Sequence, residues 1–138
     1  MRIVILILLF IFAGNVVYSS LFADKKVMRE IQRKNYMKAF HYSKYCPSRK
    51  KQLLVLNLIR NDFRSIYSNL DSVSEKDLDL LIDYMNVLPL RPEVYYDLVE
   101  KVRKSKNIRL MRKLRRNTDK PAWALMVKQD IKNLQNAE

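Results

Sequence analysis

The sequence predicts an all-α protein, and three observations support that fold class. Gly14 is the only glycine in 138 residues, whereas tight β-hairpins use glycine for positive φ angles. Leu, Lys, Arg and other residues with good helix propensity are frequent. Apolar residues recur with helical spacing, in segments separated by short connections. We expect a compact antiparallel bundle or a short helical-hairpin stack of about five to six helices, after an N-terminal apolar helix.

The N-terminal segment has the pattern of a signal peptide. Residues 3–12 form an unbroken apolar run behind Arg2, and this run has the length of a signal-peptide core. A break at residues 14–15 and a small residue, Ser19, follow it. We therefore predict cleavage after Ser19, with cleavage after Ala23 as the alternative. Residues 1–19 are then a signal peptide, and the mature protein is secreted or periplasmic.

The same segment also suits a membrane anchor. Residues 3–23 are largely apolar and, at about 1.5 Å per residue, long enough to cross a ~30 Å hydrocarbon core. Lys25, Lys26 and Arg29 follow directly, so the positive-inside tendency would leave the rest of the chain on the cytoplasmic or matrix side. The sequence leaves both alternatives open.

Residues 24–138 are expected to form a single helical domain, which is long enough to bury a core without disulfides. Cys46 is the only cysteine, which excludes an intrachain disulfide. We expect its thiol to be half-buried at a helix end before Pro47, and pairing with another chain stays open.

The first two predicted helices of this domain lie on either side of Pro47. The first covers residues near 24–45 and has four residues spaced for one face: Met28, Ile31, Tyr36 and Phe40. Ser48 is expected to cap the second, whose core section covers residues 53–70. Its inward stripe has alternating gaps of three and four residues: Leu56, Ile59, Phe63, Ile66 and Leu70.

Capping signals predict the next two helices. The motif SVSE is typical of a capping box, in which Ser72 accepts a hydrogen bond from the amide of Glu75. It predicts a helix over residues 73–86. Pro92 suits the first turn of the helix that follows.

Two further helices are predicted near the C-terminus. A short helix is expected over residues 108–117. Thr118 or Asp119 is expected to cap the last helix, which has Pro121 in its first turn.

Charge is distributed unevenly along this basic chain, whose formal net charge is +13. Residues 24–70 carry a net charge of +9, residues 71–100 carry −6 and residues 101–138 carry +9. The acidic residues of 71–100 can pair with part of either basic segment, but they cannot neutralise the excess of positive charge. Such an excess attracts anionic surfaces.

The densest group of cations lies in RLMRKLRRN, at residues 109–117. Four of them share one helical stripe, opposite Leu110, Met111 and Leu114, and are predicted to bind the anionic partner: Arg109, Arg112, Lys113 and Arg116. A solvated helix surface would show the same pattern.

A second candidate surface lies in the segment NYMKAFHYSKYC, where aromatic residues alternate with lysines. It predicts an aromatic contact surface made of Tyr36, His41, Tyr42 and Tyr45. Helical spacing also fits a structural role, with Tyr36 and Phe40 in the core and Tyr42 and Tyr45 at its rim.

No residue pattern predicts catalysis. His41 and Cys46 are the only histidine and cysteine, and five residues apart on one helix they would lie on different faces. The remaining candidate metal ligands are carboxylates such as Asp79 and Asp83, which suit the solvent side of an amphipathic helix. We therefore expect no enzymatic activity, no metal site and no cofactor.

These observations predict a small, basic, exported accessory protein that acts by binding an anionic partner. The partner is expected to be a membrane surface, an acidic protein face or a polyanion, and nucleic acid is not expected for an exported protein. The alternative is a structural subunit of a membrane complex, anchored by residues 3–23. A helical carrier of an apolar small molecule is a further alternative. The sequence leaves the oligomeric state open.

Overall fold

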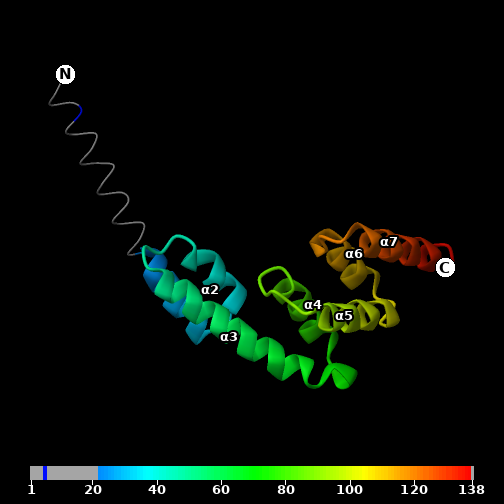
Figure 1. Cartoon of the computed structure of the whole chain (residues 1–138), viewed down its shortest axis with the longest axis horizontal. Coiled ribbons are helices and arrows are strands. Elements are labelled where there is room, and N and C mark those ends of the chain that lie inside the picture. Colours follow the sequence, from blue (N-terminus) through cyan, green and yellow to red (C-terminus); the bar gives the residue numbers. More distant parts are fainter. Residues whose placement is uncertain (1–4, 6–21, 138) are drawn as a thin grey trace. The chain divides into compact units, whose positions relative to one another are not determined.

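A computed structural model describes Ile5 and residues 22–137 of the chain (Figure 1). The predictions for residues 1–19 and 3–23 fall almost entirely outside these residues. The described part of the chain is helical and contains no strand, which confirms the all-α class. None of the helices in this part has both the length and the apolar character needed to cross a bilayer.

Residues 22–32 form the first described helix. Six α-helices and one short 3₁₀ helix follow it along residues 36–135: α2 (Tyr36–Ser43), α3 (Arg49–Tyr67), η1 (Leu70–Ser72), α4 (Glu75–Tyr84), α5 (Pro92–Lys104), α6 (Ile108–Asn117) and α7 (Pro121–Gln135). The chain divides into two compact units, which meet between Ile59 and Arg60 within α3.

The prediction of one continuous helix over residues 24–45 is wrong. The chain leaves the helix at Lys34, whose φ is 57°. There the amide of Lys34 donates to the carbonyl of Ile31, and the amide of Asn35 donates to the carbonyl of Glu30, each at 2.9 Å. This is a Schellman ending, which usually has glycine at the left-handed position. The sequence offers no glycine there, so the usual signal for this break is missing.

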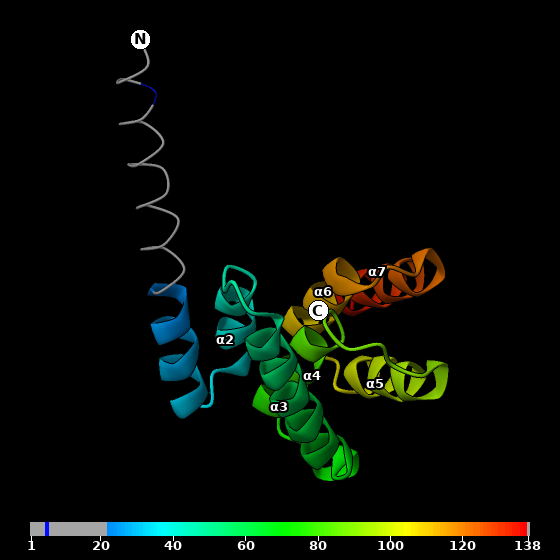
Figure 2. The same ribbon diagram turned by 60° about the vertical axis from the view of Figure 1, so that its left-hand side comes forward.

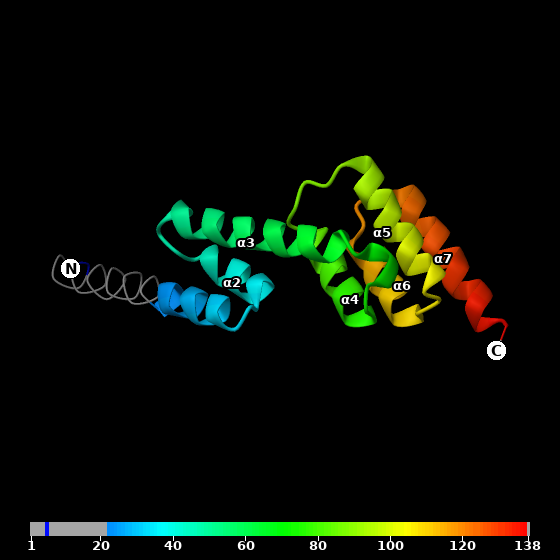
Figure 3. The same ribbon diagram turned by 90° about the horizontal axis from the view of Figure 1, so that it is seen from below.

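The N-terminal unit also buries a different helix face from the one predicted. Met28 is 45 % exposed, while Tyr36 and Phe40 are only half-buried. The buried apolar residues of this unit are small or β-branched, which lets the backbones of short helices approach closely: Ala23, Val27, Ala39, Val55 and Ile59. Figure 3 shows residues 22–32, α2 and the beginning of α3 beside one another.

Ser48 caps α3 as predicted, since its Oγ accepts a hydrogen bond from the amide of Lys50 at 3.3 Å. The helix ends at Tyr67, and the predicted extension to residue 70 is instead a turn followed by η1. Of the predicted inward stripe, Ile59 and Phe63 are buried. The other three members, Leu56, Ile66 and Leu70, are half-buried.

The predicted capping box is displaced by two residues. Ser74, not Ser72, caps α4, and its Oγ accepts from the amide of Asp77 at 3.1 Å. The sequence SVSEKD contains two overlapping Ser-x-x-acid patterns, and Ser72 already belongs to η1. The helix consequently covers Glu75–Tyr84 rather than residues 73–86.

The last three helices lie close to their predicted positions. Pro92 is in the first turn of α5, and α6 has the predicted bounds, with Asn107 accepting from the amide of Leu110 at 3.1 Å. Neither Thr118 nor Asp119 caps α7, because the N-cap position is Lys120 and makes no side-chain cap. Thr118 Oγ1 instead accepts from the Lys120 amide at 3.3 Å and hydrogen-bonds the Tyr95 hydroxyl.

Helices α4, α5, α6 and α7 pack together in the C-terminal unit (Figure 3). Helix α6 contacts each of the other three. Its buried residues are Leu110, Met111 and Leu114, and the neighbouring helices also carry apolar residues that are almost fully buried: Leu78, Leu81, Ile82, Leu98, Val99, Val102 and Val127. The core therefore fixes which face of α6 remains exposed.

Candidate functional site

Helix α6 separates its apolar and cationic residues onto opposite faces. Leu110, Met111 and Leu114 have exposed fractions of 0–1 %. The guanidinium groups opposite them, on Arg109, Arg112 and Arg116, are exposed. Figure 2 shows that α7 runs alongside α6. The burial of Leu110, Met111 and Leu114 places the apolar face of α6 against the packed helices. The predicted stripe of arginines is thus on the surface.

Lys113 has a different environment from the three arginines. Its Nζ lies 2.8 Å from Asp79 Oδ2 and 2.8 Å from Asp83 Oδ2, both on α4. It also donates to the main-chain carbonyl of Asp79 at 2.9 Å. The Lys113 side chain is only 20 % exposed. It therefore joins α6 to α4 and is already paired.

Arg109 takes part in the same group at its edge. Its Nη2 lies 3.6 Å from Asp79 Oδ1, and its side chain is 72 % exposed. Two carboxylates and two cations, Asp79, Asp83, Arg109 and Lys113, thus form a neutral cluster between α4 and α6. The carboxylates of Asp79 and Asp83, which were candidate metal ligands in the sequence, therefore form ion pairs with Arg109 and Lys113.

Three arginines of α6 remain without such partners. Within the described residues, no carboxylate pairs with Arg112, Arg115 or Arg116, and all three side chains are exposed. Sequence analysis did not include Arg115, because it lies beside the stripe rather than on it. The packing of α7 against α6 is what gives Arg115 cationic neighbours, and helical periodicity alone cannot reveal that packing.

The predicted aromatic surface is brought together in part. The ring centroid of His41 lies 5.9 Å from that of Tyr42 and 5.7 Å from that of Tyr45, both edge to face. Lys26 Nζ lies 4.9 Å from the centroid of Tyr42. Tyr36 is half-buried and makes no ring contact with the other three residues within residues 22–137.

The aromatic group extends to the end of the N-terminal apolar segment. Lys26 Nζ is also 4.5 Å from the ring centroid of Phe22, which is 49 % exposed. Tyr45 is 65 % exposed. Amphipathic rings beside a cation are typical of surfaces that contact a membrane interface or another protein.

Cys46 lies close to this group and is half-buried, as predicted. Its Sγ is 3.8 Å from the carbonyl oxygen of Tyr42. Burial and a hydrogen bond with Asp24 raise the pKa of the thiol to about 11. A hydrogen bond from Lys51, whose Nζ lies 2.6 Å from Asp24 Oδ2, lowers the pKa of that carboxyl group. Cys46 is consequently protonated and a poor nucleophile near neutral pH.

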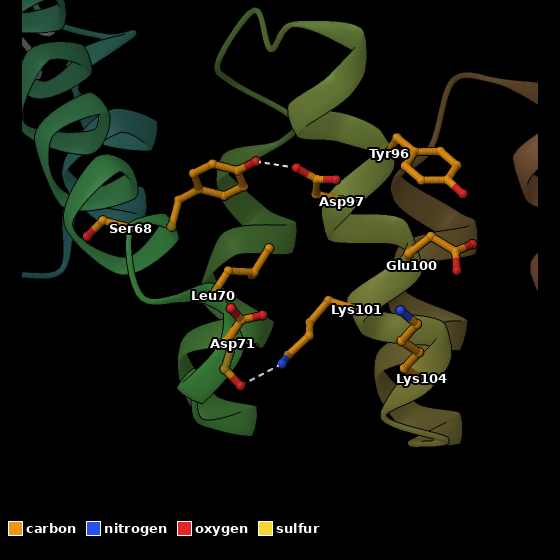
Figure 4. A pocket seen from close by; sticks show the side chains of 9 residues that line it. Ser68, Leu70, Asp71, Tyr96, Asp97, Glu100, Lys101 and Lys104 are labelled. Carbon is orange, nitrogen blue, oxygen red and sulfur yellow. Dashed lines mark hydrogen bonds between the residues drawn. The ribbon is translucent and has the colours of Figure 1, made fainter.

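A hollow of about 510 Å³ lies between the end of α3 and α5 (Figure 4). The Tyr67 hydroxyl donates to Asp97 Oδ2 at 2.6 Å, and Lys101 Nζ donates to the Asp71 carbonyl at 2.7 Å. The hydrogen bond to Asp97, followed by burial, raises the pKa of Tyr67 to about 12. Tyr67 therefore acts as a hydrogen-bond donor that joins the two segments.

The carboxylate of Glu100, which also lines this hollow, is paired as well. Arg103 Nη1 lies 2.5 Å from Glu100 Oε1, and Arg103 Nε lies 2.5 Å from Asp130 Oδ2 on α7. Asp97 and Glu100, two of the acids of α5, thus form contacts within the fold. The exposed arginines of α6 are, in contrast, available to a ligand.

Comparisons with models of protein families, with curated proteins and with solved structures found no match. The assignment of a function consequently depends on the geometry of the described residues. They define a basic, all-α chain in which α6 presents three exposed arginines without a carboxylate partner among the described residues.

Proposed function

We propose that the protein is a small, exported, basic accessory protein that binds an anionic partner through α6. The observation that carries this proposal is the exposure of Arg112 and Arg116 on the face opposite a fully buried apolar stripe. Arg109 lies on the same face and is largely exposed. We further propose that the helices form a bundle or a short helical-hairpin stack, which holds this face rigid.

The internal pairing of the acidic residues supports this proposal. Asp79 and Asp83 pair with Lys113, while Asp130 pairs with Arg103. Carboxylates that are used inside the fold cannot shield the exposed arginines. A chain with a formal net charge of +13 therefore presents positive potential to an anionic membrane surface, an acidic protein face or a polyanion.

The aromatic group of the N-terminal unit favours a second function, a structural subunit of a membrane complex. Phe22 and Lys26 follow the largely apolar residues 3–21 in the sequence, and Lys26 Nζ lies over the rings of Phe22 and Tyr42. Aromatic and basic side chains at the end of an apolar stretch are typical of a membrane interface. The hollow in Figure 4 has mainly polar lining residues and gives no support to a carrier of an apolar small molecule.

The test of the proposed function measures the affinity of the protein for heparin, anionic liposomes and co-purifying proteins at several salt concentrations. The test variant carries Gln at Arg109, Arg112 and Arg116. The control variant carries Gln at Lys76, Arg91 and Lys104, which are exposed elsewhere in the same unit. Both variants lose three positive charges.

We expect the test variant to lose most of the salt-dependent affinity, because exposed charges act over a Debye length of only ~8 Å at physiological salt. The control variant should lose little of it. Lys113 is left unchanged, because its removal would disturb the contact between α4 and α6. Equal binding by the test variant and the parent would show that the arginines form an ordinary solvated surface.

A further inference from the structure

A second cationic surface lies beside the arginine face, in a hollow of about 450 Å³ between α6 and α7. Three cationic side chains line it: Arg115 from α6, and Lys128 and Lys132 from α7. The other lining residues are Leu125, Gln129, Ile131 and Gln135, so none of the described residues around the hollow is acidic.

None of the three cations, Arg115, Lys128 and Lys132, has an ion-pair partner in the part of the chain that the structure describes. The amide of Gln129 is directed to another side chain, since its Nε2 donates to Asn133 Oδ1 at 3.0 Å. Three like charges around one hollow repel one another, and an anion that enters it relieves this repulsion.

Leu125 adds an apolar element at the same place. Its side chain is 66 % exposed, whereas Ile131, in the same hollow, is 6 % exposed. Leu125, Lys128 and Lys132 follow one another at intervals of three and four residues, so they share one face of α7. An exposed leucine among cations fits a partner that offers both negative charge and an accessible apolar layer.

We propose that this face of α6 and α7 docks onto an anionic phospholipid bilayer. Lipid phosphate oxygens accept hydrogen bonds from Arg115, Lys128 and Lys132, and Leu125 enters the boundary between headgroups and acyl chains. An acidic protein segment would satisfy the cations but would not require Leu125. This inference rests on the proposed function and specifies the partner.

The energetics of membrane adsorption set the expected effects. Each Lys or Arg near an anionic bilayer typically strengthens adsorption about five-fold, so the loss of three cations should weaken it about 100-fold. Replacement of Leu125 by Gln removes the apolar contact and should weaken vesicle binding about five- to ten-fold. It should leave binding to a soluble polyanion unchanged.

The experiment measures sedimentation of the full chain with vesicles of phosphatidylcholine, with and without phosphatidylglycerol. Pure phosphatidylcholine provides the background, because an apolar N-terminus would insert into either kind of vesicle. The groove variant, named after the hollow between α6 and α7, carries Arg115→Gln, Lys128→Gln and Lys132→Gln. A second variant carries Leu125→Gln. The control is again Gln at Lys76, Arg91 and Lys104, with heparin as the soluble polyanion.

We expect the groove variant to lose the phosphatidylglycerol-dependent binding and the control to retain it. Far-UV circular dichroism checks that each variant is folded. If the triple exchange unfolds the protein, the single charge reversal Lys128→Glu replaces it, because Lys128 is exposed. The expected loss for that variant is at least ten-fold.

Four outcomes would overturn the inference. Vesicle binding equal to that of the control variant would show that the hollow has no role. A groove variant that loses heparin binding as strongly as vesicle binding, together with a neutral Leu125→Gln, would identify an acidic polymer or protein as the partner. Loss of vesicle binding only in the variant with Gln at Arg109, Arg112 and Arg116 would refute docking through the hollow, while the proposed function stands. Loss of binding in neither variant would refute both proposals.

Discussion

Replacement of Lys113 by Met tests whether this lysine holds α6 against α4. Methionine keeps a long apolar side chain but removes the ammonium group. The ammonium nitrogen of Lys113 lies 2.8 Å from each of two carboxylates, on Asp79 and Asp83. Its removal therefore breaks two ion pairs and leaves two negative charges one helical turn apart.

The magnitude follows from how exposed these groups are. The side chains of Lys113, Asp79 and Asp83 are 20 %, 29 % and 34 % exposed, so solvent screens the pairs in part. Fully exposed pairs contribute up to about 1 kcal/mol, and hydrogen bonds to charged groups contribute ~1.5–3 kcal/mol. We expect Lys113→Met to reduce the free energy of unfolding by about 1–2 kcal/mol.

Chemical denaturation followed by far-UV circular dichroism measures this loss. Arg112→Met is the matched control, because Arg112 is exposed and has no carboxylate partner in the described residues, and it should change stability by less than ~0.5 kcal/mol. In the background of Asp79→Asn and Asp83→Asn, Lys113→Met should cost far less. Equal losses for Lys113→Met and Arg112→Met would refute the bridging role and return Lys113 to the binding stripe.

Four further results are expected. Phe63→Ala should cost ~3–5 kcal/mol in urea denaturation, because Phe63 is 6 % exposed, and a loss below ~1 kcal/mol would make that stripe peripheral. Lys106→Gly should stabilise the chain by ~0.5–1 kcal/mol, since Lys106 has φ 53°, and no gain would show that this conformation is not costly. Alkylation of Cys46 near pH 8 should be ~100-fold slower than in the unfolded chain, because its thiol pKa is raised from 9.0 to about 11. Because the pKa of the thiol is higher in the folded than in the unfolded chain, its proton adds to the free energy of unfolding. This contribution is complete below pH 9.0 and is lost as the pH rises through about 11. Intact mass of the native protein should begin at Ser20, and retention of Arg2 would favour the anchored subunit.

Sequence reasoning succeeded where local chemistry decides the structure. The bounds of α6 and the start of α5 at Pro92 depend on caps and on proline geometry, which neighbouring residues determine. It failed at Lys34, where a lysine adopts the left-handed conformation that glycine normally signals. It also failed at Ser74, because two overlapping capping patterns compete and Ser72 belongs to the preceding 3₁₀ helix.

The candidate site was predictable only in part, because it depends on helix packing as well as on local sequence. Helical periodicity places Arg109, Arg112 and Arg116 on one exposed face, and the structure has them there. The same periodicity placed Lys113 with them. Its pairing with Asp79, 34 residues earlier in the chain, depends on which helix packs beside α6. The sequence pattern of one helix carries no information about that neighbour.

The neutral cluster of Arg109, Lys113, Asp79 and Asp83 has a consequence for how the protein approaches its partner. The side of α6 nearest α4 contributes little net charge, whereas the side nearest α7 presents Arg115, which no carboxylate among the described residues pairs with. The charge around α6 is therefore asymmetric across the helix axis. An external field exerts a torque on such an arrangement and rotates the α7 side toward negative charge before contact. For the anionic partner proposed above, the cluster would thereby raise the fraction of encounters that occur in a productive orientation, and so the association rate.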